Sequence, residues 1–176
     1  MIVSSNTSII TTKWLKQSQQ DLFSAIAEIH SILEQKIAEK KGEILEAQVA
    51  SNPPKHQIDS HLQRLCENFS LSEFERDVLL LCAGMEFDPN WGLLCAEIAN
   101  DPKQAYPTFS LAMALLDHAD WSALSPAANL RKWHLVEIGA GHTLTSSPLR
   151  INERILHYLM GDEHLDERLF KFFEPV

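Results

Sequence analysis

The stretch RKWHLVEIGAGHTLTSSPLRI, residues 131–151, decides the fold class of this chain, because the apolar pattern changes its period there. In its first part, RKWHLVEI, Trp133 and Leu135 fall on one face and alternate with residues of the other, which is the two-residue period of a strand. GAGH (139–142) predicts a turn, and TLTSSPLRI (143–151) predicts a second strand. We therefore expect a small β-hairpin with a glycine-bearing loop.

Helical signals surround this hairpin. SEFE (72–75) is a capping box: the Ser72 side chain accepts from the backbone amide of Glu75, and the Glu75 side chain accepts from the backbone amide of Ser72. The box predicts the start of a central helix that runs to about Met85. Apolar spacing and capping residues predict further helices over 56–68, 109–118, 125–130 and 153–160, and in the tail before Pro175. Thr108 and Asn152 are the caps of the helices that follow them. Another helix is predicted from Asp88, with Pro89 as its first residue, to about 99–103, and a short turn from Asp120 to Leu124.

A long helix is predicted over residues 13–49, where apolar side chains recur at the helical period. Glu34 and Ala38 fall among the positions expected to be exposed, and Gly42 is the weak point of the helix. Residues 1–12 show no period and are expected to be loosely held. The apolar stripe must pack either along the rest of the chain or against a second copy of it.

SNPPK (51–55) ends that helix, because two prolines bar its continuation. We therefore predict a helical arm over 1–55 and a helical domain over 56–176. Helices followed by a two-stranded hairpin and another helix form the winged-helix arrangement, a variant of the helix-turn-helix. The expected fold class is mainly α with a small β-hairpin: a helical arm plus a winged-helix-like domain.

The charge balance argues against general nucleic-acid binding. The chain of 176 residues has 15 Lys and Arg against 24 Asp and Glu, a net charge of −9, and all of the excess falls within 56–176. Such a body repels phosphate backbones. The longest apolar run, 78–85, is too short for a bilayer, and no signal peptide precedes it. We expect a cytoplasmic protein with no membrane partner.

The motifs that catalysis needs are missing from the sequence. No G-x-x-x-x-G-K-[ST] phosphate loop occurs, and the G-x-G of GAGH lies between two strands. The histidine spacings do not suit a metal, and no nucleophile has a readable base partner. Cys82 and Cys95 lie among leucines and are expected to be buried. We expect no enzyme activity, no cofactor and no metal.

The hairpin region is the local exception in charge. Its basic residues and one histidine form the candidate interaction surface: Arg131, Lys132, His142, Arg150 and Arg154. The preceding segment, 121–130, lies where a DNA-binding winged helix has its recognition helix, yet it carries no Lys or Arg. Nucleic-acid binding is therefore disfavoured, and contact with a protein is favoured. The tryptophans Trp91, Trp121 and Trp133 are expected in the core rather than as interface anchors.

Four stretches carry a resemblance to a known family: LSEFERDVLLLCAGMEFDP (71–89), YPTFSLAMALL (106–116), residues 121–151, and NERILHYLMGDEHLDERL (152–169). They resemble the winged-helix-like region near the N-terminus of a family of bacterial AAA+ ATPases, some of which accompany contractile, phage-tail-like injection systems. In that family the region precedes the ATPase module and recognises a partner or substrate.

The resemblance implies a non-catalytic recognition domain that acts by protein–protein interaction. Its partner would be another protein, or the ATPase module of the same or another chain. Two alternatives stay open: a winged-helix DNA-binding regulator, and a self-association module that dimerises through the 13–49 helix.

Overall fold

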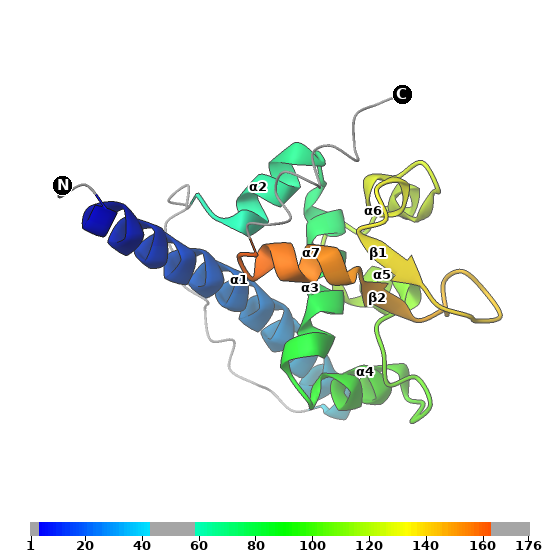
Figure 1. Ribbon diagram of the computed structural model, residues 1–176. Helices are drawn as coiled ribbons and strands as arrows, with labels where there is room; N and C mark the ends of the chain where they lie inside the picture. The colour runs from blue at the N-terminus through cyan, green and yellow to red at the C-terminus, as the bar shows by residue number, and fades with distance from the viewer. Residues whose placement is uncertain (1–3, 43–58, 163–176) are drawn as a thin grey trace.

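The computed structural model describes residues 4–42 and 59–162, with side chains from Thr12 onward. Its elements follow in the order α1 (Ser4–Lys41), α2 (His61–Asn68), α3 (Glu73–Phe87), α4 (Trp91–Ala99), α5 (Phe109–Leu115), the 3-10 turn η1 (Trp121–Leu124), α6 (Asn129–Lys132), β1 (Val136–Ile138), β2 (Leu149–Ile151) and α7 (Glu153–Leu159) (Figure 1). The mainly α fold class with one small antiparallel hairpin is confirmed.

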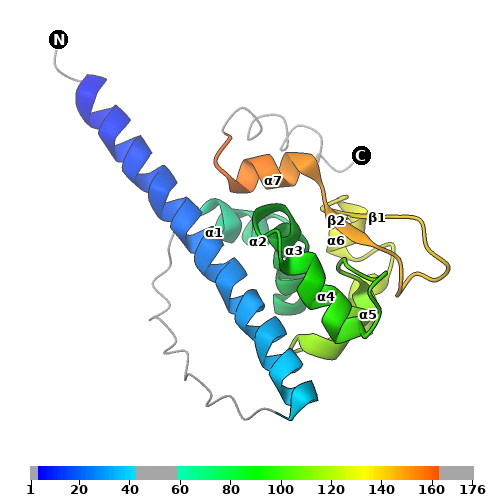
Figure 2. The same cartoon turned by 90° about the horizontal axis from the view of Figure 1, so that it is seen from below.

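Helix α3 forms the centre of the molecule, and α1, α4, α5, α6 and β2 pack around it (Figure 2). The predicted capping box is present: Ser72 Oγ accepts from the Glu75 amide at 3.1 Å, and Glu75 Oε2 accepts from the Ser72 amide at 3.0 Å. After this first turn the helix is buried on nearly every side, so its sequence is apolar all round. Cys82, on this helix, and Cys95, on α4, are buried as expected.

Helix α1 departs from the prediction at both ends. It begins at Ser4, although residues 1–12 were expected to be irregular, and it ends at Lys41 rather than at residue 49. Gly42 follows with a φ of +70°, a left-handed conformation that glycine adopts without strain and that closes a helix. The predicted continuation over 43–49 lies outside the described residues, and so do SNPPK (51–55) and the domain boundary placed there.

The apolar face of α1 belongs to the core of this same chain. Its buried residues join the cluster formed by α3 and α4: Leu22, Ala25, Ile26, Ile29, Leu33 and Ile37. Ala38, expected to be exposed, is 4% exposed, because this face is wider than the apolar stripe alone indicates. Figure 2 shows α1 running along the whole body, with its first turns extending past α2 and α7.

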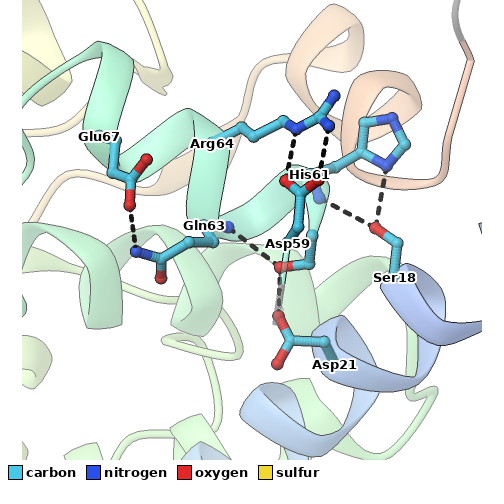
Figure 3. A network of polar contacts seen from close by, with 8 residues as sticks. Ser18, Asp21, Asp59, His61, Gln63, Arg64 and Glu67 are labelled. Carbon is cyan, nitrogen blue, oxygen red and sulfur yellow. Dashed lines mark hydrogen bonds and ion pairs between the residues drawn. The ribbon is translucent and has the colours of Figure 1, made fainter. Parts of the chain in front are cut away.

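Polar contacts hold α1 to the start of α2 (Figure 3). Ser60 caps α2 by accepting from the Gln63 amide, and it donates from its hydroxyl to Asp21 Oδ2 of α1 at 2.5 Å. Ser18 Oγ of α1 accepts from the His61 amide at 2.9 Å and also lies 2.9 Å from His61 Nδ1. The N-terminal amides of α2 are thus satisfied partly by α1.

A second set of contacts holds the other end of α1 to α4. Lys40 Nζ donates to the Ile98 carbonyl, and Lys41 Nζ forms an ion pair with Glu97 at 2.6 Å. These lysines complement the negative end of α4, where the last carbonyls lack helical partners. The buried part of the apolar stripe of α1 thus packs within this chain, and dimerisation through the 13–49 helix stays a prediction.

Several helix boundaries differ from the sequence prediction. Asp88 does not begin α4: its amide donates to the Gly84 carbonyl and closes α3, and its carboxylate accepts from the Asn90 amide. Helix α2 begins at His61 rather than at residue 56, and α5 ends at Leu115 rather than at 118.

Other local predictions hold. Thr108, Asp120 and Asn152 accept backbone hydrogen bonds at the starts of α5, η1 and α7.

One helix prediction is wrong. The segment 125–130, predicted as a helix, is instead a turn followed by the single helical turn of α6.

The hairpin is shorter in its strands and longer in its loop than predicted. Only three pairs form its register: Val136 with Ile151, Glu137 with Arg150, and Ile138 with Leu149. The loop covers 139–148 instead of GAGH alone. Its hydroxyl groups bond within the loop, with Thr143 Oγ1 2.7 Å from Ser146 Oγ and Ser147 Oγ donating to the Thr143 carbonyl at 2.6 Å, which replaces the predicted strand pairing.

Within residues 4–42 and 59–162, no helix is both long enough and apolar enough to cross a bilayer. The helix predicted in the tail before Pro175 lies outside the described residues.

Candidate interaction surface

The five residues of the predicted interaction surface lie on four different elements. Arg131 and Lys132 belong to α6, His142 to the hairpin loop, Arg150 to β2, and Arg154 to α7. The sequence prediction placed the first two on a strand, but the chain turns once as a helix before β1 begins. All five except Arg131 are exposed.

The cations of α6 are engaged within the domain. Arg131 Nη1 donates to the Leu124 carbonyl at 2.6 Å and so joins α6 to η1. The Lys132 ammonium lies 4.8 Å from the centre of the Trp133 ring, a cation–π distance. Both side chains therefore make contacts within the local fold, although Lys132 stays exposed.

Carboxylates accompany the basic residue of the hairpin. Arg150 faces Glu137 across the strand pair, and its Nε lies 3.8 Å from Glu86 Oε1 of α3. Asn152, the cap of α7, donates from Nδ2 to Glu137 Oε1 at 3.2 Å. Exposed pairs of this kind contribute little energy, yet they cancel the local positive field. The hairpin is thus a surface of mixed charge, unlike the basic wing of a DNA reader.

The element in the position of a recognition helix is broken into two single turns, η1 and α6. The second turn is attached to the start of α3: Asn129 Nδ2 donates to the Ser70 carbonyl at 3.0 Å, and the Leu130 amide lies 3.4 Å from Glu75 Oε1. A recognition helix reads the major groove through side chains that reach the base edges. A four-residue turn packed on α3 does not provide one.

The first turn exposes a large aromatic side chain that the sequence prediction had placed in the core. Trp121, the first residue of η1, is 65% exposed. Trp91 is in the core as predicted, with its indole Nε1 donating to the Leu81 carbonyl at 3.0 Å, and Trp133 is half-buried against Phe69. The periodicity rule misses Trp121 because a one-turn element after a cap has no second turn to mark its buried face.

Acidic residues precede this exposed tryptophan in the sequence. Asp120 caps η1 by accepting from both the amide and the hydroxyl of Ser122, and these hydrogen bonds lower the pKa of its carboxyl. Asp117 is exposed four residues before the tryptophan, and the intervening His118 lies 3.4 Å from Glu73 of α3. From Gln104 to Leu130 the sequence contains no Lys or Arg. The segment that leads into η1 is therefore acidic, and the nearest cation in the sequence, Arg131, is bonded to the last carbonyl of η1.

Comparison with known proteins gives one family. The model of the family described as "Winged helix domain, variant" matches residues 10–173. The chain belongs to this family. The match covers nearly the whole of the chain and includes most of α1. Among curated proteins and among solved structures, none matches the chain.

The cysteines of this variant winged helix domain are poorly suited to thiol chemistry. Burial raises the pKa of the Cys66 thiol to about 11 and that of Cys95 to about 12, and it raises the pKa of Cys82 further. Among the described residues no group of three His, Cys, Asp or Glu side chains is placed to hold a metal ion.

We expect the folded domain to resist alkylation. With the pKa of Cys66 near 11, its thiolate fraction at pH 8 is on the order of a hundredfold below that of an ordinary cysteine. Iodoacetamide labelling followed by mass spectrometry should therefore show Cys66 reacting at least about tenfold slower than a free thiol. All three cysteines should react at the ordinary rate in denaturant. Rapid labelling of Cys82 or Cys95 in the native protein would contradict the buried positions of these residues.

Proposed function

We propose that this variant winged helix domain is a non-catalytic recognition module, which binds a protein partner and serves an AAA+ ATPase motor on the same or another chain. The observation that carries the proposal is the broken recognition segment: η1 exposes Trp121 beside its cap Asp120, and α6 is a single turn whose Arg131 is bonded to the Leu124 carbonyl. The link to the AAA+ motor is supported by the sequence resemblance over residues 71–89, 106–116 and 121–169.

The chemistry of the chain supports a role through contact. The sequence lacks a phosphate loop, so ATP turnover would be supplied by the motor. The thiols of Cys66, Cys82 and Cys95 are held protonated by burial, which makes them poor nucleophiles. What remains is a rigid scaffold with an exposed aromatic side chain, and aromatic residues anchor many protein interfaces.

DNA binding is the second candidate, because the family shares the scaffold of DNA-binding winged helices and Arg150 is exposed on the hairpin. The charges oppose it. Arg131 is committed to the Leu124 carbonyl, Arg150 lies close to Glu86 and Glu137, and the chain as a whole carries −9. Few cations are left to replace counterions on a duplex.

Calorimetric titration with the Walker-motif ATPase module of a protein from the resembled AAA+ family tests the proposal. We expect saturable binding with a dissociation constant on the order of 1 μM, and no phosphate release when the chain alone is given ATP. The matched control is a duplex series, random and genomic, at about 50 mM salt, where we expect no retention. Retention of the duplexes without binding to the module would favour the DNA-binding alternative, and ATP turnover by the chain alone would contradict a non-catalytic role.

A further inference from the structure

We propose that Trp121, together with Asp117 and Asp120, forms a docking site for an arginine-bearing segment of the protein partner. The inference rests on the proposed recognition function and adds the chemistry of the partner to it. We call these three residues the η1 site.

Trp121 stands out by its exposure. Trp121 is 65% exposed, whereas Trp91 is buried and Trp133 is half-buried. A tryptophan left in water leaves a large apolar area uncovered, and binding a partner would cover it. The site is also held in place, since Asp120 caps η1, and Arg131 bonds to the Leu124 carbonyl at its end. A turn whose backbone is already held loses little conformational entropy on binding.

Charge gives the class of partner. Asp117 and Asp120 are exposed on the same short segment as the indole, and Glu73 approaches from α3 through His118. The nearest cation along the chain, Arg131, donates to the Leu124 carbonyl at the far end of η1, three residues after the indole. A face of a tryptophan attracts cations, and carboxylates pair with them. Arginine suits both groups better than lysine, because its planar guanidinium stacks on the ring and bonds to a carboxylate with two hydrogens.

Another exposed apolar residue provides the matched control. Leu93 of α4 is 68% exposed, and Figure 1 shows α4 well separated from α6. The neighbour of Leu93 on the exposed side of this helix, Glu97, is paired with Lys41. Removal of the Leu93 side chain therefore takes away a similar exposed apolar surface without touching the η1 site.

The test is fluorescence anisotropy with the full chain and a labelled peptide of alternating arginine and serine, at about 50 mM salt. We expect Trp121→Ala to weaken binding by roughly three- to thirtyfold, and Trp121→Phe by less. The double change Asp117→Asn with Asp120→Asn should weaken binding about two- to fivefold per charge and reduce its salt dependence. The cap of η1 is retained in this variant, because an asparagine side chain caps as well as an aspartate. Leu93→Ala should leave the affinity unchanged.

Several results would overturn the proposal: no binding by the unchanged chain, equal losses for Leu93→Ala and Trp121→Ala, or equal binding of a glutamate–serine peptide. A dimer in light scattering that Trp121→Ala dissociates would also overturn it, since the site would then bind a second copy. Titration with the ATPase module separates the two proposals. If the module binds the unchanged chain and the Trp121→Ala variant equally, the recognition function stands and the η1 site fails. If the peptide binds at Trp121 but the module does not bind, the site stands and the link to the motor fails.

Discussion

Leu33→Ala is expected to lower the free energy of unfolding by about 2–5 kcal/mol. Leu33 lies on α1, is fully buried, and belongs to the core cluster that α3 and α4 complete. Truncation removes buried apolar area and leaves a cavity. Neither α3 nor α1, which polar contacts hold to α2 at one end and to α4 at the other, can move in to fill this cavity. Urea denaturation followed by circular dichroism measures the change.

Leu93→Ala is the matched control for this prediction, since it makes the same substitution on a helix at a position that is 68% exposed. We expect it to change the free energy of unfolding by about 0.5 kcal/mol or less. Equal effects of the two variants would show that α1 is not part of the core, and α1 would then be the separate arm that the sequence first indicated.

Gly84→Ala is expected to destabilise the domain by about 1–3 kcal/mol or more, although alanine is normally the better helix former by roughly 0.5–1 kcal/mol. A Cβ at residue 84 would lie 2.2 Å from Cζ2 of the Trp91 ring. That indole is buried, and its Nε1 bonds to the Leu81 carbonyl, so it cannot move aside without losing a hydrogen bond. Thermal unfolding followed by tryptophan fluorescence gives both the stability and the environment of the ring.

Gly139→Ala serves as the control for the glycine substitution. A Cβ at residue 139 would meet Pro148 at 3.4 Å, an ordinary contact, and the position is exposed. We expect a change within about 0.5 kcal/mol. A stabilising effect of Gly84→Ala would contradict the close packing of α3 against α4.

Local signals predicted much of the fold. The capping box of Ser72 and Glu75 and the caps Thr108, Asp120 and Asn152 are contacts within a few residues, so the sequence alone contains them. The change to a two-residue period found the hairpin for the same reason.

Boundaries set by distant contacts could not be predicted in this way. Asp88 has the sequence of a helix start, but its amide closes α3, and the choice depends on how Trp91 packs beneath Gly84. The prediction for the segment 125–130 failed similarly, because α6 forms where Asn129 and Leu130 reach the start of α3. These contacts join residues more than fifty positions apart.

In the candidate surface, too, the sequence predicted local features but not the contacts made in the folded chain. Composition located the basic residues Arg131 and Arg150, but their partners, the Leu124 carbonyl and Glu86, become neighbours only in the folded chain. The exposure of Trp121 was missed because tryptophan is usually buried and a single turn gives no periodicity.

Hydrogen exchange of the full chain, measured by mass spectrometry with the ATPase module and separately with genomic duplexes, tests the central claim most directly. The claim is that this variant winged helix domain recognises protein through the surface around η1. We predict slowed exchange across 117–133 with the module and unchanged exchange with the duplexes. Slowed exchange of the hairpin, 136–151, with the duplexes and no change with the module would contradict it.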